Sequence, residues 1–154
     1  PGRYMATVLP TEPPQFAFVD DAAFTGKLKA KQIPPGSVVA GGNNFGCGSS
    51  REQAVSCLKG YELVIVAKNF ARIFLQNGIN LGLRMIVCPA IEAADGDDLE
   101  ITVTEVINKT SGKCFPITPL PKSRQAIIDA GGLIPFTRRR LLETSARGRP
   151  NATS

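Results

Sequence analysis

The chain contains no histidine, and only four of its 154 residues are cysteines. Without histidine, a Ser-His-Asp or Cys-His catalytic arrangement cannot form within the chain, and the commonest general base is missing. The cysteines form no Cys-x-x-Cys pair, so the sequence favours neither a disulfide framework nor a zinc site. We expect reduced, mostly buried thiols in a cytoplasmic protein. These cysteines are Cys47, Cys57, Cys88 and Cys114.

Long apolar runs are also missing, because none is long enough to span a bilayer and no signal segment opens the chain. The sequence starts at Pro1 as if inside a longer protein, which leaves a removed leader open. At 154 residues, 43% of them hydrophobic, the chain is long enough for one domain with its own core. We therefore expect a soluble, single-domain protein.

Acidic residues are outnumbered, 13 against 18 lysines and arginines, which gives a net charge of +5. Much of the excess lies near the C-terminal end, and aromatic residues do not alternate with the basic ones, so nucleic-acid binding is not favoured. We expect residues 137–142 to form the end of a helix, where cations complement the helix dipole. The prediction is a folded domain over residues 1–142 and a polar, disordered tail over residues 143–154.

Apolar periodicity predicts alternating strands and helices, which indicates an α/β fold. Strand, helix and strand in succession imply parallel crossovers. Residues 99–106 alternate as one strand, and residues 113–117 are predicted to pair back with it as a hairpin. Further strands are expected at residues 38–40, 63–67 and 84–88, and helices at residues 16–28, 51–58, 69–78 and 123–130.

The most informative segment is a glycine-rich turn between a predicted strand and a predicted helix, Asn43-Asn44-Phe45-Gly46-Cys47-Gly48-Ser49-Ser50-Arg51-Glu52-Gln53-Ala54. Ser49 or Ser50 is the expected N-cap of that helix. The first N–H groups of a helix and its dipole stabilise an oxyanion, and the planar fork of Arg51 matches a carboxylate or a phosphate. A capped helix with Arg51 in solvent is the simpler alternative.

This segment, together with Lys68-Asn69-Phe70-Ala71-Arg72-Ile73 and Asn77-Gly78-Ile79-Asn80-Leu81-Gly82-Leu83, resembles the swivelling domain of the aconitase superfamily. More narrowly, the chain is similar to separate small subunits of the 3-isopropylmalate dehydratase and homoaconitase type. The resemblance implies a swivelling β/β/α domain, with a mixed sheet flanked by helices. The family's first strand, which precedes the Pro1-Gly2-Arg3-Tyr4 match, is missing here.

The resemblance also implies a hydro-lyase that dehydrates and rehydrates a small di- or tricarboxylate. In the family a [4Fe-4S] cluster acts as Lewis acid on the substrate hydroxyl, and its ligands lie on a large partner subunit. Ser49 would be the base that removes the carbon-bound proton, and Ser50 and Arg51 would bind substrate carboxylates. The chain would bind no metal itself and would be active only in a heteromer with the large subunit.

Substrate choice is implied by the loop of Tyr4, Met5, Ala6 and Thr7, which in the family contacts the group that differs among substrates. Homoaconitase-like members have an arginine at the position of Ala6, and alanine cannot pair with an additional carboxylate. A 2-alkylmalate is therefore favoured, above all 3-isopropylmalate, an intermediate of leucine biosynthesis. Gln53 replaces the usual family histidine, a variant associated more with homoaconitase-like sequences.

Several alternatives stay open at this point. The chain could belong to a homoaconitase or to another alkylmalate dehydratase, such as dimethylmalate dehydratase. It could also be a non-catalytic module whose glycine turn binds a phosphate or a carboxylate. Nucleic-acid binding through the basic end is a third interpretation, and it predicts a strongly salt-dependent affinity.

Overall fold

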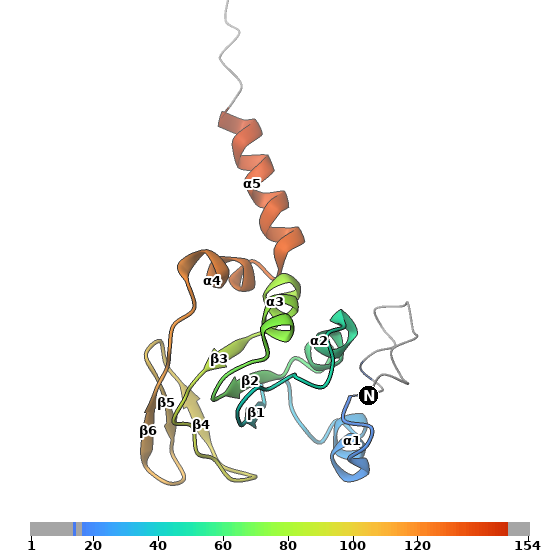
Figure 1. Ribbon diagram of the computed structural model, residues 1–154, viewed down its shortest axis with the longest axis vertical. Coiled ribbons are helices and arrows are strands. Elements are labelled where there is room, and N and C mark those ends of the chain that lie inside the picture. The colour runs from blue at the N-terminus through green and yellow to red at the C-terminus, as the bar shows by residue number, and fades with distance from the viewer. Residues whose placement is uncertain (1–13, 15–16, 148–154) are drawn as a thin grey trace, which may run out of the picture.

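The computed structural model describes residue 14 and residues 17–147, and its helices and strands alternate as the α/β class predicts (Figure 1). The helices are α1 (Ala22–Lys29), α2 (Glu52–Lys59), α3 (Arg72–Leu81), α4 (Lys122–Asp129) and α5 (Leu133–Arg147). The strands are β1 (Val38–Gly41), β2 (Val64–Ala67), β3 (Met85–Val87), β4 (Leu99–Ile101), β5 (Glu105–Asn108) and β6 (Lys113–Pro116).

The described strands form two three-stranded sheets of different kinds. In the first, β2 lies between β1 and β3 and all pairs are parallel, as the strand-helix-strand order predicts. In the second, β5 lies between β4 and β6 and all pairs are antiparallel. An isolated antiparallel bridge between Val87 and Thr118 connects the end of β3 with the segment that follows β6. The expected mixture of parallel and antiparallel strands is thus divided between two sheets.

Strand β2 is buried on both faces, as its continuous apolar sequence predicts. Because side chains alternate along a strand, Ile65 packs on the side of α2 and α3, whereas Val64 and Val66 face the antiparallel sheet. Val106 and Phe115 of that sheet complete the second core. The parallel sheet therefore lies between helices α2 and α3 on one side and the antiparallel sheet on the other (Figure 1).

The prediction of one strand over residues 99–106 was wrong, because the chain turns between β4 and β5. The hydroxyl of Thr102 accepts hydrogen bonds from the N–H groups of Thr104 and Glu105 and donates one to the carbonyl of Glu105. These bonds satisfy the backbone of the turn locally, and the side chain of Val103 is 93% exposed at its tip. The alternation of apolar residues simply continues through the turn.

The start of one helix and the end of another also differ from the prediction. Helix α1 begins only at Ala22, because Asp21 is its N-cap and accepts a hydrogen bond from the N–H of Phe24 at 3.0 Å. Helix α3 passes through Gly78 and ends at Gly82, which has the left-handed conformation common after helices. Gly78 lies inside the helix because the side chain of Met85 packs against it.

The basic run over residues 137–142 lies in the middle of α5 and not at a helix end. The helix continues through Arg147, so the expected boundary of the polar tail at residue 143 falls inside it. No glycine or proline interrupts the sequence between Phe136 and Gly148, which explains why the helix continues. The rest of the expected tail lies outside the described residues.

Candidate functional site

The glycine-rich turn lies at the carboxyl edge of the parallel sheet, where the chain leaves β1. In open α/β sheets this edge is where ligands bind. The turn is held against the segment that follows β2 by an isolated parallel bridge between Phe45 and Phe70. The N–H of Phe45 donates to the carbonyl of Asn69 at 3.1 Å, and the N–H of Ala71 donates to the carbonyl of Phe45 at 2.9 Å. Two loops therefore form one surface.

Asparagine side chains fix the shape of this surface. The Oδ1 of Asn69 accepts from the N–H of Asn44 at 2.6 Å, and its Nδ2 donates to the Oδ1 of Asn43 at 2.9 Å. From α3, the Nδ2 of Asn77 donates to the carbonyl of Ser50 at 3.1 Å. The sequence analysis did not predict these positioning roles. The one signal in the sequence for Asn69 is its place as a polar residue shortly after a buried strand.

Three aromatic rings support the turn from below. Phe45 meets Phe70 and Phe74 edge-on, with ring centroids 6.0 and 5.6 Å apart. Gly46 lies directly on Phe74, so a Cβ at this position would overlap the ring, and its φ of 87° is in the left-handed region. Glycine is therefore required at position 46 for two independent reasons.

The structure brings Ser49, Ser50 and Arg51 together at the start of α2. Arg51, not a serine, is the N-cap of the helix, and it makes no side-chain capping bond, so the predicted serine cap is wrong. The hydroxyl of Ser49 instead accepts a hydrogen bond from the N–H of Arg51 at 3.2 Å, within the turn that precedes the helix. The half-buried Ser49 oxygen thus faces a backbone donor and lies near the positive end of the helix dipole.

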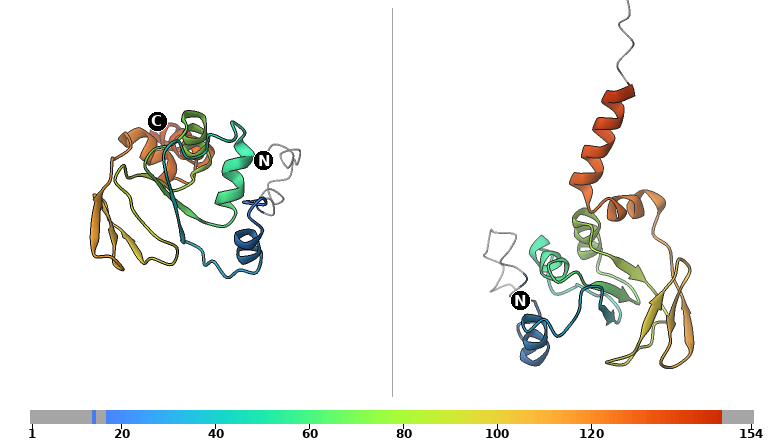
Figure 2. Two further views of the ribbon diagram at one scale, coloured as in Figure 1. Left: turned by 60° about the horizontal axis from the view of Figure 1, so that its bottom comes forward. Right: turned by 180° about the vertical axis from the view of Figure 1, so that it is seen from behind.

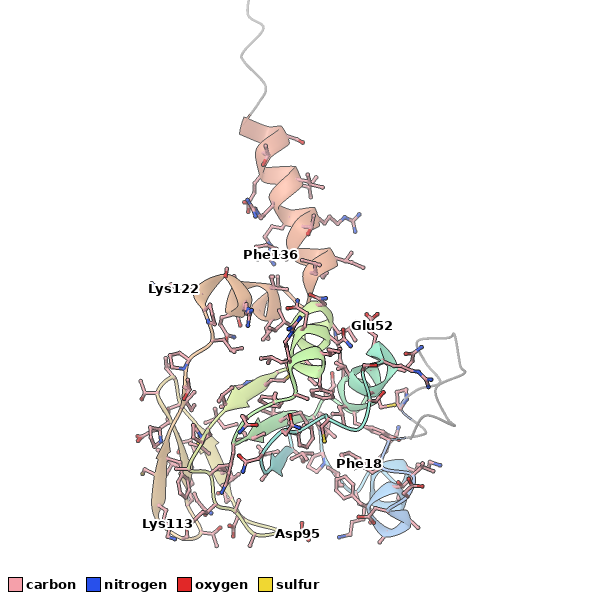
Figure 3. All side chains as sticks on the ribbon, viewed as in Figure 1. Phe18, Glu52, Asp95, Lys113, Lys122 and Phe136 are labelled. Atoms are coloured by element: carbon pink, nitrogen blue, oxygen red, sulfur yellow. The ribbon has the colours of Figure 1, made fainter. Side chains whose placement is uncertain are left out.

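The surroundings of Ser50 and Arg51 are open to solvent. Glu52, the first residue of α2, is exposed as well and complements the helix dipole (Figure 3). The residues expected to contact the variable part of the substrate lie outside the described residues: Tyr4, Met5, Ala6 and Thr7.

A pocket of about 380 Å³ adjoins Ser49. Apart from this serine, the described residues of its wall are apolar or glycine, and they include the rings of Phe18, Phe45 and Phe74. Cys57 is also part of the wall, and burial raises the pKa of its thiol. Two larger pockets are lined by residues outside the glycine-rich turn. The pocket therefore combines one hydroxyl with space for an apolar group.

No disulfide joins the four cysteines, and Cys57 and Cys88 are buried whereas Cys47 and Cys114 are exposed, so the expectation of mostly buried thiols holds for half of them. Burial raises the pKa of the Cys88 thiol as well, which favours the neutral form over a metal-binding thiolate. Over residue 14 and residues 17–147, no three His, Cys, Asp or Glu side chains are grouped to hold a metal ion. In the same part of the chain, no helix combines the length and apolarity that crossing a membrane requires.

We expect the Asn69→Ala variant to hold the glycine-rich turn less firmly against the segment that follows β2. It removes two side-chain hydrogen bonds, and because the site is exposed we expect a loss of about 1–2 kcal/mol in the free energy of unfolding. Urea denaturation followed by circular dichroism measures this loss. The matched control is Gln76→Ala, which removes an exposed side-chain bond to Asn80 on α3. Equal stability of the two variants would contradict the positioning role.

Comparisons with known proteins place these features in context. Residues 11–90 match the family described as the aconitase C-terminal domain. The isopropylmalate/citramalate isomerase small subunit of Methanocaldococcus jannaschii is 39% identical, over 94% of this chain and 86% of the relative. The 3-isopropylmalate dehydratase small subunit of Methanosarcina mazei is 41% identical, over 93% and 88%. A crystal structure of 3-isopropylmalate dehydratase from Methanocaldococcus jannaschii superposes with a TM-score of 0.85 at 36% identity, covering 96% of this chain and 88% of that one.

Proposed function

This chain belongs to the aconitase C-terminal domain family, and we propose that it is the small subunit of a heteromeric hydro-lyase, a 3-isopropylmalate dehydratase. The observation that carries the proposal is the position of Ser49 and Arg51 at the start of α2, in a chain similar to such small subunits over nearly its whole length. The proposed enzyme would act in leucine biosynthesis, in the cytoplasm, where its thiols stay reduced.

In the proposed reaction, Ser49 removes the carbon-bound proton of the substrate. A serine oxygen is a weak base, so the negative charge that develops on it must be stabilised. The N–H of Arg51, 3.2 Å from the oxygen, and the dipole of α2 both act in this direction. The guanidinium of Arg51 and the hydroxyl of Ser50 bind substrate carboxylates and hold the carbon near Ser49.

The described residues of this chain do not fit an iron–sulfur cluster, because its cysteines lie far apart in the sequence and form no metal-binding group. We therefore place the [4Fe-4S] cluster of the proposed enzyme on a large partner subunit. This chain supplies the base and the carboxylate-binding groups, and it has no activity alone.

An apolar branch on the substrate is supported by the pocket beside Ser49, because the other described residues of its wall carry no charged side chain. The alkyl group of a 2-alkylmalate gains about 25 cal/mol for each Å² that it buries there. A longer acidic arm would lose its hydration in the same place without gaining a partner. This favours alkylmalates over homocitrate as substrates.

The Ala6→Arg variant is expected to shift the substrate preference towards homocitrate-like substrates, because it adds a cation that can pair with the additional carboxylate. The ratio of kcat/KM for homocitrate to that for 3-isopropylmalate, measured in the assembled heteromer, is expected to rise by roughly 10-fold or more. The Ala6→Leu variant, which adds bulk without charge, is the control. An unchanged ratio in Ala6→Arg would exclude this position from substrate selection.

An anaerobic dehydration assay tests the function itself. The chain is measured alone and with the large cluster-binding subunit from the same source, on 3-isopropylmalate, dimethylmalate, citramalate, citrate and homocitrate. We expect turnover only in the mixture and fastest with 3-isopropylmalate. A complex that forms, contains its cluster and turns over none of these substrates would contradict the proposal and favour a binding module.

A further inference from the structure

Helix α5 projects away from the rest of the molecule in Figure 1 and in the right-hand view of Figure 2. It has 15 residues, and its main contacts, with α3 and α4, are at its base. An isolated helix of about 12–15 residues is only marginally stable in water, and most helices in proteins are stabilised by packing. The outer part of α5 therefore presents a face that lacks the packing expected of a stable helix.

The base of α5 is fixed firmly. Gly131 and Gly132, with φ angles of 88° and 123°, connect it to α4 in a conformation that side chains rarely adopt. A Cβ on Gly132 would lie 2.6 Å from the carbonyl oxygen of Asn80, and one on Gly82 would overlap the backbone of Gly131. This close backbone contact with the end of α3 gives the helix a defined direction.

Large apolar side chains are exposed along one side of α5, with Ile134 near its base and Leu141 and Leu142 in its outer half. Ile134, Leu141 and Leu142 are 82%, 63% and 66% exposed. Their spacing of seven and eight residues places them on one side of the helix, with Arg138 between them. Large apolar side chains exposed together are typical of a binding surface. We call these four residues the α5 face.

The charge of α5 indicates what covers this face. The helix contains Arg138, Arg139, Arg140 and Arg147, against Glu143 as its one acidic residue. A second copy of the chain, paired antiparallel over the same face, would place Arg138 against its own copy, and like charges in contact are unfavourable. A groove with an apolar floor and acidic rims complements both properties of the face.

We propose that the α5 face docks into an apolar, acid-rimmed groove of the large cluster-binding subunit, and so holds the two subunits together. This inference rests on the proposed function, since it concerns the same heteromer. The apolar residues supply the affinity, and the arginines supply orientation and a rate of association that depends on salt.

Two sets of substitutions in the full chain test the inference. The first is Ile134→Gln with Leu141→Gln and Leu142→Gln, which keeps good helix formers. The second reverses the charge, with Arg138→Glu, Arg139→Glu and Arg140→Glu. The control reverses two exposed charges on α4, Lys122→Glu and Arg124→Glu. Circular dichroism of each isolated chain verifies that it is folded.

Titration of the large subunit with each chain gives a dissociation constant from calorimetry and a half-saturating concentration from activity. We expect both constants to rise by roughly 10- to 100-fold for the two α5 sets and to stay unchanged for the control. At saturation kcat is expected to equal that of the unmodified heteromer, because α5 does not contact the Ser49 loop. For the charge-reversed chain, the salt dependence of the association rate should change sign, because salt then screens a repulsion between like charges.

Native affinity in both α5 sets would overturn the inference while leaving the proposed function intact. A homodimer of the unmodified chain that is lost in the α5 sets, seen by light scattering, would overturn it in favour of a second copy. If the unmodified chain forms no complex with the large subunit, the proposed function fails, and the inference fails with it.

Discussion

The Ser49→Ala variant is expected to assemble normally with the large subunit and to lose nearly all turnover. Removal of a positioned general base lowers kcat by about 10²–10⁴-fold. The hydroxyl lies beside the apolar pocket and accepts a hydrogen bond from the N–H of Arg51, so the substitution removes the only hydroxyl that the described residues bring to the pocket wall. Assembly is expected to be unaffected, because the substitution makes the residue smaller without changing the backbone. Steady-state kinetics and calorimetric titration measure the two properties separately.

Two further variants make this result specific. Ser50→Ala is expected to raise KM more than it lowers kcat, because the proposed role of Ser50 is binding. Ser111→Ala changes an exposed serine in the turn between β5 and β6 and should behave like the unmodified chain. If the Ser49→Ala heteromer keeps its kcat, Ser49 is not the base, and the loop serves only to bind an anion.

The Gly46→Ala variant is expected to be strongly destabilised. Its φ of 87° costs a residue with a side chain about 1–2 kcal/mol. The added methyl group would overlap the ring of Phe74, and overpacking a core costs about 1–3 kcal/mol more. Together these terms predict a loss of roughly 2–5 kcal/mol in the free energy of unfolding. Urea denaturation of the isolated chain measures it.

Gly48 provides the matched control in the same turn. A Cβ on Gly48 meets nothing within 4 Å, and its φ is not in the left-handed region. The Gly48→Ala variant is therefore expected to unfold at nearly the same urea concentration as the unmodified chain. If both alanine variants lose the same stability, neither the contact with Phe74 nor the left-handed φ of Gly46 is the cause, because the effect of alanine on the unfolded chain is by itself stabilising.

Much of the fold was predictable from local sequence. The apolar run of β2 required burial on both faces, and the glycines and serines after β1 required a turn before a helix. The errors arose where side chains make hydrogen bonds with backbone groups, because the periodicity of apolar residues gives no sign of such bonds. The hydroxyl of Thr102 closes a turn inside an alternating pattern of apolar residues. The hydroxyl of Ser49 accepts a hydrogen bond from the N–H of Arg51, the residue directly before the helix. Such choices depend on three-dimensional packing.

The candidate site was located by its motif, but its construction was not predicted. The sequence indicated Ser49 and Arg51, because a serine and a cation after a glycine turn are chemically conspicuous. The roles of Asn69 and Asn77 depend on loops that are 25 or more positions apart in the chain and meet only in the fold. The projecting part of α5 was equally hidden, since its leucines could have been core residues.

Helix α3 contacts the glycine-rich turn through Asn77, and the chain at the end of α3 contacts the base of α5 through Gly82, five positions further along. At 1.5 Å of rise per residue, the two contacts are about 7.5 Å apart along the helix. In the proposed heteromer, docking of α5 on the partner subunit would also fix how far Ser49 extends across the interface, because α3 connects the two. A displacement of about 1 Å can lower the reaction rate roughly 10²-fold. The rate of the assembled enzyme would therefore depend on the glycines that hold the end of α3 against the start of α5.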